Sequence, residues 1–303
     1  MEKKYTEKDI QELEDFLDKE DVFTPTVSYL NTSSIDNFLK DEIIFTPLIG
    51  RVRREEKDTK EYLEKKEYIF DKIDNYDFTN ELKIKVENIK NNINKDKFYD
   101  FKDKYKSLYT NDIIRYAMLI KDDNKEYTKD IGKFLFKNGI ILFNEHYPEN
   151  ANDDFKRLDG FSCFYNRYPI IVIYDIHDKR RMLFTILHEL YHLMYDENEK
   201  YADKFAGSAL LTVNNVKEEF KEYNIFKIEN DIGYENIIRR LCLNNYISVT
   251  AATKTLINYN ILIKKEEDYR SQFEDIRKEV EKEAKNKFNK DIIINSIYDI
   301  IKK

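Results

Sequence analysis

The chain has 303 residues, so it is long enough to bury a sizeable hydrophobic core and to hold two or three structural units. Acidic and basic residues are interspersed and leave a net charge of -7, which argues against broad electrostatic binding to nucleic acid. A local basic patch such as Arg51–Arg54 is still compatible with this composition. Two cysteines are too few for a disulfide framework, and neither a signal peptide nor an apolar run of ~20 residues is recognisable. We therefore expect a soluble cytoplasmic protein.

The first 108 residues carry helical patterns but no recognisable chemistry. Residues 6–17 are amphipathic with Thr6 as the N-cap, and charged residues dominate from Arg51 to about Lys106. We expect residues 1–108 to form a mostly helical region of unassigned role that packs on another part of the chain.

Residues 109–215 combine helical and strand patterns. Thr110–Asp112 is a capping cluster, Gly139 is a helix stop, and Leu158–Gly160 is expected to form a turn. The expected elements are helices over 113–120 and 127–137, followed by strands over 140–143, 161–165 and 170–174. This order predicts an α+β core in which a small β-sheet packs on the helix that comes next.

That next helix contains the sequence His188-Glu189-Leu190-Tyr191-His192. Apolar residues recur at helical spacing along it, at positions 183, 186, 187, 190, 193 and 194. His188 and His192 are four residues apart, so they lie one turn apart on the same face. This is the H-E-x-x-H arrangement, in which two imidazoles bind zinc and the glutamate acts as the base. The alternative is a helix with two surface histidines and an incidental glutamate.

A second helix follows after only three residues, 196–198. Its apolar positions are 202, 205, 206, 209 and 210, which again have helical spacing. The short connection predicts a tight helical hairpin, with Glu199 roughly level with His192. Asp203 lies one turn further on, about 6 Å along the axis, level with His188. Glu199 can then complete a His-His-Glu set for zinc, and Asp203 can accept the spare N–H of His188.

Other assignments remain open for these carboxylates. Asp196 and Glu199 also fit a capping pattern, and Asp196 and Glu197 compete with Glu199 as the third ligand. Asp203 is alternatively a solvated helix carboxylate. The residues that compete for the role of stabilising an oxyanion are Tyr165, Tyr174, His146 and His177, which the sequence does not rank.

The motifs of Arg180–His192 and Glu199–Leu211 resemble those of the ImmA/IrrE family of zinc metallopeptidases. That family typically reads R-x-F-T-x-A-H-E-L-G-H and then E-x-x-A-N/D-x-F-A-x-x-L-L-M-P. Leu158–Gly160 and Pro169–Ile173 are similar to the segments that precede this motif in the family. The similarity covers about residues 110–215, roughly a third of the chain.

The resemblance implies a zincin-like core in which the sheet packs on the motif helix and on a following helix that carries a glutamate. It implies His188, His192 and Glu199 as zinc ligands and Glu189 as the catalytic base. Family members are regulatory proteases that cut a transcriptional repressor with a helix-turn-helix domain. Such a repressor is therefore the expected substrate class.

This chain departs from the family pattern at three places. Tyr191 replaces the usual glycine, Leu187 replaces a small residue, and Thr212–Val213 replaces Met-Pro. We expect these positions beside the cleft, where they would change substrate selection more than metal binding.

Residues 216–303 are predicted to be helical. The stretch 248–262, with Ser248 as N-cap, resembles the second helix of a helix-turn-helix. A packing helix is favoured over a DNA-reading helix because Lys254 is its only positive charge. We expect one solvated helix over 269–290 and an amphipathic terminal helix over 292–301.

The sequence thus predicts a zinc-dependent endopeptidase with helical extensions on both sides of its core. Zinc would polarise the scissile carbonyl, and Glu189 would transfer the proton from water to the leaving amine. Two rival hypotheses are a regulatory protein that uses the metal only as a structural clip, and a DNA-binding regulator that works through residues 248–262.

Overall fold

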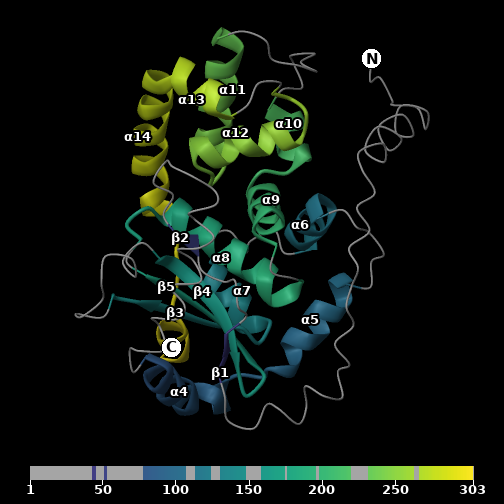
Figure 1. Cartoon of the computed structure of the whole chain (residues 1–303), viewed down its shortest axis with the longest axis vertical. Helices are drawn as coiled ribbons and strands as arrows, with labels where there is room; N and C mark the ends of the chain where they lie inside the picture. The colour runs from purple at the N-terminus through teal and green to yellow at the C-terminus, as the bar shows by residue number, and fades with distance from the viewer. Residues whose placement is uncertain are drawn as a thin grey trace. The chain divides into compact units, whose positions relative to one another are not determined.

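The computed structural model describes residues 43–45, 51–52, 78–106, 113–123, 130–147, 158–174, 176–195, 198–219, 231–262 and 266–302. All of them belong to one compact unit, Asp41–Lys303. The protein is α+β, mostly helical with a small sheet, as predicted (Figure 1). Several predictions fall outside the described residues: the helix over 6–17, the Thr110–Asp112 cap, and the competing ligands Asp196 and Glu197. No helix in the described ranges is both long and apolar enough to cross a membrane.

The sheet is built around two long antiparallel strands, β4 and β5. The strand order is β1-β4-β5-β3, and β2 also pairs with β4. β3 runs parallel to β5, while β1 and β2 run antiparallel to β4. The strands are β1 (Ile43–Phe45), β2 (Arg51–Val52), β3 (Ile141–Glu145), β4 (Leu158–Tyr165) and β5 (Tyr168–Tyr174).

A two-residue turn joins β4 to β5. Asn166 and Arg167 both have positive φ angles, 47° and 66°, as a tight hairpin turn of this length requires. The turn pairs Tyr165 with Tyr168 and sets the register of the hairpin. The expected strands over 161–165 and 170–174 are confirmed, and each is longer than predicted.

The predicted turn at Leu158–Gly160 was wrong, because these residues begin β4. Gly160 pairs with Ile173 inside the sheet. A Cβ atom at Gly160 would lie 2.6 Å from the carbonyl oxygen of Val172 and 3.2 Å from Cγ2 of Thr185. Gly160 therefore permits close packing of backbone and helix, and it does not form a turn.

Both faces of the sheet are covered, so β5 is a nearly continuous apolar run. Successive side chains alternate between the faces. Ile171 and Ile173 join the larger hydrophobic cluster with the motif helix α8 (Lys179–Met194). On the opposite face, Ile170 and Val172 join a smaller cluster. That cluster includes residues of α4 (Phe78–Ile89) and α15 (Ile297–Ile301).

α8 and α9 (Glu199–Leu210) form the hairpin that the short connection predicts. Asp178 caps α8 by accepting a hydrogen bond from the backbone N–H of Arg180. Asn198 caps α9, with its Oδ1 3.1 Å from the backbone nitrogen of Tyr201. The cap of α9 is thus provided by Asn198, which leaves the carboxylate of Glu199 available for other contacts.

The helices between the N-terminal region and the sheet pack on the same core. The predicted helices over 113–120 and 127–137 are present as α6 (Ile113–Asp123) and α7 (Ile131–Lys137). α7 begins only at Ile131 because the Asp130 side chain caps it. Gly139, with φ of 72°, follows α7, as predicted for a helix stop. Lys102 on α5 (Asp96–Lys106) donates to the carbonyl oxygen of Leu193 at 3.1 Å, which connects α5 to α8. The remaining elements of this part are η1 (Lys90–Asn92), α5 (Asp96–Lys106), α6 (Ile113–Asp123) and α7 (Ile131–Lys137).

The described residues of the C-terminal part are mostly helical, as predicted. Ser248 caps α12 (Val249–Asn258) by accepting a hydrogen bond from the backbone N–H of Ala251, which confirms the predicted N-cap. The single solvated helix predicted over 269–290 was wrong: the helix breaks at Phe273, and the second piece has an apolar stripe. Val280, Ala284 and Phe288 are buried there, at a spacing of four residues. The terminal helix begins at Ile297 and not at 292, because Ser296 and Asp299 form a capping box there.

The elements of this C-terminal part are α10 (Val213–Glu219), α11 (Asp231–Asn244), α12 (Val249–Asn258), α13 (Glu266–Gln272), α14 (Glu274–Asp291) and α15. A buried arginine connects them to α8. The Arg180 side chain is fully buried and lies 2.7 Å from Asp178 and 3.3 Å from Glu281 of α14. Glu281 also accepts a hydrogen bond from the backbone N–H of Val249, the first residue of α12.

Candidate metal centre

The two histidines of the motif face each other on one side of α8. The Nε2 atoms of His188 and His192 are 3.1 Å apart, and the exposed fractions of the two residues are only 1% and 4%. This is the arrangement expected for positions one helical turn apart. The alternative of two incidental surface histidines is therefore wrong, because neither side chain is at the surface.

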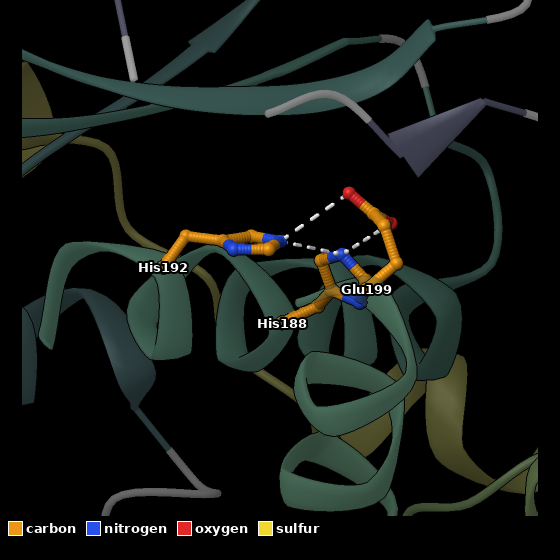
Figure 2. Close-up of side chains that lie close together, drawn as sticks. All are labelled: His188, His192 and Glu199. Atoms are coloured by element: carbon orange, nitrogen blue, oxygen red, sulfur yellow. Dashed lines mark hydrogen bonds and ion pairs between the residues drawn. The ribbon is translucent and has the colours of Figure 1, made fainter. Parts of the chain in front are cut away.

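Glu199 completes the group from the first turn of α9. Its Oε2 lies 3.3 Å from Nε2 of His188, and its Oε1 lies 3.5 Å from Nε2 of His192. Figure 2 shows the two imidazoles converging from α8 on the Glu199 carboxylate. Among the described residues, these three form a group whose ligand atoms all lie within 4.8 Å of one another.

The separations suit one small divalent cation. Zinc binds nitrogen and oxygen at about 2.0–2.2 Å, and tetrahedral geometry at that length puts neighbouring ligand atoms about 3.3–3.6 Å apart. The two histidine Nε2 atoms are 3.1 Å apart, and the Glu199 oxygens lie 3.3 and 3.5 Å from them, so all three separations are close to this range. The residues therefore fit a metal ion with two nitrogen donors and one carboxylate, and such a set leaves a fourth position open.

Asp203 lies behind His188. Its Oδ1 is 3.0 Å from the Nδ1 atom of His188, on the side of the ring away from the facing Nε2 atoms. A carboxylate at this place accepts the Nδ1–H proton and leaves Nε2 free for a metal. Asp203 is thus in contact with a candidate ligand and is not merely a solvated helix residue.

The environment of His188 favours its charged form. Burial opposes protonation, but the hydrogen bonds to Asp203 and Glu199 outweigh it and raise the pKa of His188 to about 9. In the metal-free protein this imidazole is therefore protonated at neutral pH. A metal ion has to displace that proton to bind.

Glu189 is enclosed between α8 and the sheet, with an exposed fraction of 0%. Burial raises the pKa of its carboxyl group, against the opposing influence of His188 and His192. The hydroxyl of Ser162 on β4 donates to its Oε2 at 3.0 Å. A carboxylate with a raised pKa is a stronger base than one with an ordinary pKa.

Sequence reasoning missed the contact between Ser162 and Glu189. The predicted strand over 161–165 included Ser162, but nothing in the strand pattern indicated which element its side chain would meet. Alternation along the strand offered a signal: Ser162 is a polar residue between apolar neighbours, so it belongs to the opposite face from Phe161 and Cys163.

Two of the four residues considered for oxyanion stabilisation are on the wrong side of the sheet. Tyr165 and Tyr174 belong to the cluster on the face opposite α8. His177 is exposed ahead of α8, and its carbonyl oxygen accepts a hydrogen bond from Asn289. His146 is exposed and follows β3. The two tyrosines are therefore on the opposite side of the sheet from the candidate metal centre.

We expected the positions that depart from the family pattern to lie beside a cleft, and the structure shows what their side chains contact. Leu187 and Tyr191 are buried in the larger hydrophobic cluster. The Tyr191 ring packs against Phe205 of α9, with ring centroids 5.7 Å apart. Thr212 caps α10 through hydrogen bonds with Asn215. These side chains fill the core and the helix ends, so their sizes follow from packing.

We found no protein-family model, no curated protein and no solved structure that matches this chain. The resemblance to the ImmA/IrrE family therefore stays a prediction that rests on the motif residues.

Proposed function

We propose that the protein is a zinc-dependent endopeptidase of the ImmA/IrrE type, with a zincin-like core, that acts in the cytoplasm. The observation that carries this proposal is the convergence of His188, His192 and Glu199 at 3.1–3.5 Å beside the buried carboxylate of Glu189. Two imidazoles and one carboxylate are a ligand set that suits zinc, and the H-E-x-x-H spacing puts a base next to it.

His188, His192 and Glu199 would hold the ion, and Asp203 would orient His188. When bound, zinc supplies Lewis acidity that polarises the scissile carbonyl and makes water more acidic. Glu189 takes a proton from the attacking water and delivers it to the nitrogen of the leaving amine. The raised pKa of Glu189 suits both transfers, since the group must accept a proton and then release it.

The substrate class that the family resemblance favours is a helix-turn-helix transcriptional repressor. DNA binding by the protein itself has less support, because most of α12 is buried: Val249, Ala251, Ala252, Thr253, Thr255 and Leu256 are enclosed in the fold. In the rival hypothesis the metal is only a structural clip and the protein does not hydrolyse peptides. The same geometry fits both hypotheses, so an experiment must distinguish the peptidase from the structural metal site.

The test is Glu189→Gln, compared with wild type and with Glu279→Gln on the exposed side of α14 as the matched control. Gln keeps the shape of the side chain and can still accept a hydrogen bond from Ser162, but it cannot accept a proton at neutral pH. We expect about one zinc per chain in all three proteins, and a loss of cleavage of about 10²- to 10⁴-fold in Glu189→Gln alone.

Cleavage would be assayed on repressors encoded by neighbouring genes and on a peptide library made by tryptic digestion of a cell lysate. Zinc content would be measured on the same samples. A metal clip predicts that wild type and Glu189→Gln behave alike at equal zinc content. Full zinc occupancy in a His188→Ala, His192→Ala double variant would contradict the metal assignment itself.

A further inference from the structure

Strand β4 packs along α8, and the spacing of the contacting residues is similar on the two elements. Gly160 and Ser162 are two strand residues apart, about 6.8 Å, while Thr185 and Glu189 are one helical turn apart, about 6 Å. A Cβ on Gly160 would lie 3.2 Å from Thr185, and the Ser162 hydroxyl lies 3.0 Å from Glu189. The two pairs are therefore successive contacts between the strand and the motif helix.

The missing side chain at Gly160 brings the strand close enough for a short hydroxyl to reach Glu189. A salt bridge also connects β4 and α8: Arg181 Nε donates to Oδ2 of the buried Asp159 at 2.8 Å. Ser162 has an exposed fraction of only 1%, so little water competes for its hydroxyl. The contact between Ser162 and Glu189 is thus built into the packing of β4 on α8.

The two oxygens of Glu189 have different surroundings. Oε2 accepts the hydrogen bond from Ser162. Oε1 is buried and has no hydrogen-bond partner within the described ranges. A buried polar atom without a protein partner is uncommon and calls for a specific explanation. Here the open oxygen belongs to the carboxylate that follows a candidate metal ligand directly in the chain.

We propose that Ser162 is a positioning residue for the general base, which rests on the proposed function above. The Ser162 hydroxyl holds Oε2 by a hydrogen bond and so fixes the rotation of the Glu189 carboxylate. Oε1 is then the oxygen that accepts the proton. Oε1 takes one proton from the attacking water as the water oxygen bonds to the carbonyl carbon. The C–N bond then breaks, and Oε1 returns the proton to the amine nitrogen. Ser162 keeps its own proton throughout.

A simpler role for Ser162 would be to satisfy a buried carboxylate and so stabilise the fold. The two roles differ in what they affect. Positioning changes the rate of the bound complex, because the base is misaligned only for the chemical step. A purely structural role lowers the stability of the protein and leaves the turnover of the folded fraction unchanged.

The experiment compares zinc-loaded wild type, Ser162→Ala and Ser162→Thr with Ser208→Ala. Ser208 is a matched control: it is a buried serine on α9 whose hydroxyl has no hydrogen-bond partner in the described part of the chain. The probe is the peptide that wild type cuts best in the tryptic library. We expect Ser162→Ala to lose about 10- to 100-fold in kcat with KM unchanged. Ser162→Thr, which keeps the hydroxyl, should retain most of the activity, and Ser208→Ala should match wild type.

Two further measurements do not depend on peptide cleavage. Zinc content should be equal in all four proteins, because the Ser162 hydroxyl donates to Glu189, which is not one of the proposed ligands. In the metal-free protein, Ser162→Ala should lower the urea midpoint of unfolding. The same change should lower it less in a Glu189→Ala background, since the partner is already gone.

The outcomes separate this proposal from the proposed function. If wild type cleaves and Ser162→Ala has the same kcat, the positioning role is wrong and the peptidase stands. Loss of zinc from Ser162→Ala, an equal loss of activity in Ser208→Ala, or strictly additive urea shifts would each also overturn it. If zinc-loaded wild type cuts neither the library nor a repressor, both proposals fail.

Discussion

The Nδ1 atom of His188 lies 3.0 Å from Oδ1 of Asp203, across the hairpin that joins α8 to α9. Asp203 contacts the ring nitrogen of His188 that points away from the candidate metal position, whereas Nε2 faces that position. It therefore orients the imidazole and fixes which nitrogen is free.

The first prediction concerns this contact. Asp203→Asn keeps the size of the side chain but removes its charge, so it should lower zinc affinity or activity by about 10- to 100-fold. Zinc affinity would be measured by competition with a coloured chelator. Asp203→Ala should act more strongly, because it removes the acceptor altogether. Unchanged affinity in both variants would mean that Asp203 does not support His188.

The second prediction is a pH dependence of the metal-free protein. The pKa of His188 is raised to about 9 in the folded state, above the value of about 6.5 in unfolded chains. A raised folded-state pKa stabilises the protein fully below about pH 6.5, and this contribution is lost as the pH rises through about 9. The free energy of unfolding in the presence of a chelator should therefore fall between pH 7 and pH 9.5.

Other groups also titrate in that range, so the Asp203→Asn variant is the control. Removing the charged partner should lower the pKa of His188 and make the pH dependence shallower. Urea unfolding of both proteins at a series of pH values measures the difference. Parallel curves for the two proteins would rule out Asp203 as the cause of the shift.

The third prediction distinguishes the third ligand from its neighbour in the chain. Glu199→Ala should weaken zinc retention by more than the about 10- to 100-fold expected of supporting contacts, since it removes a ligand. Glu197→Ala should leave zinc retention unchanged. Both would be dialysed against the same chelator series, and residual zinc would be measured. Zinc loss from Glu197→Ala alone would show that the wrong carboxylate has been assigned.

The fourth prediction concerns the close packing of β4. Gly160→Ala would place a Cβ 2.6 Å from the backbone oxygen of Val172, so the strands must separate. Overpacking of this kind costs about 1–3 kcal/mol of unfolding free energy. In Gly207→Ala the new Cβ meets only the side chain of Thr255, and alanine improves helix propensity, so the loss should be smaller. Equal losses in urea unfolding would contradict this account.

The sequence alone was enough to predict the features that depend on local spacing. Helical periodicity put His188 and His192 on one face, and a three-residue connection brought Glu199 and Asp203 beside them. The Ser248 cap was predicted correctly for the same reason, because a cap involves only residues three apart.

Only the tertiary structure decided which distant residues meet these local features. Gly160 signals a turn in isolation, yet it lies inside a strand because α8 packs against it. The stretch 269–290 has a solvated composition, yet Val280 is buried because this part of the chain packs on α11. Ser162 meets Glu189 across 27 residues of chain. Such pairings depend on how a strand and a helix are stacked in space, and the spacing of residues along the chain does not specify that stacking.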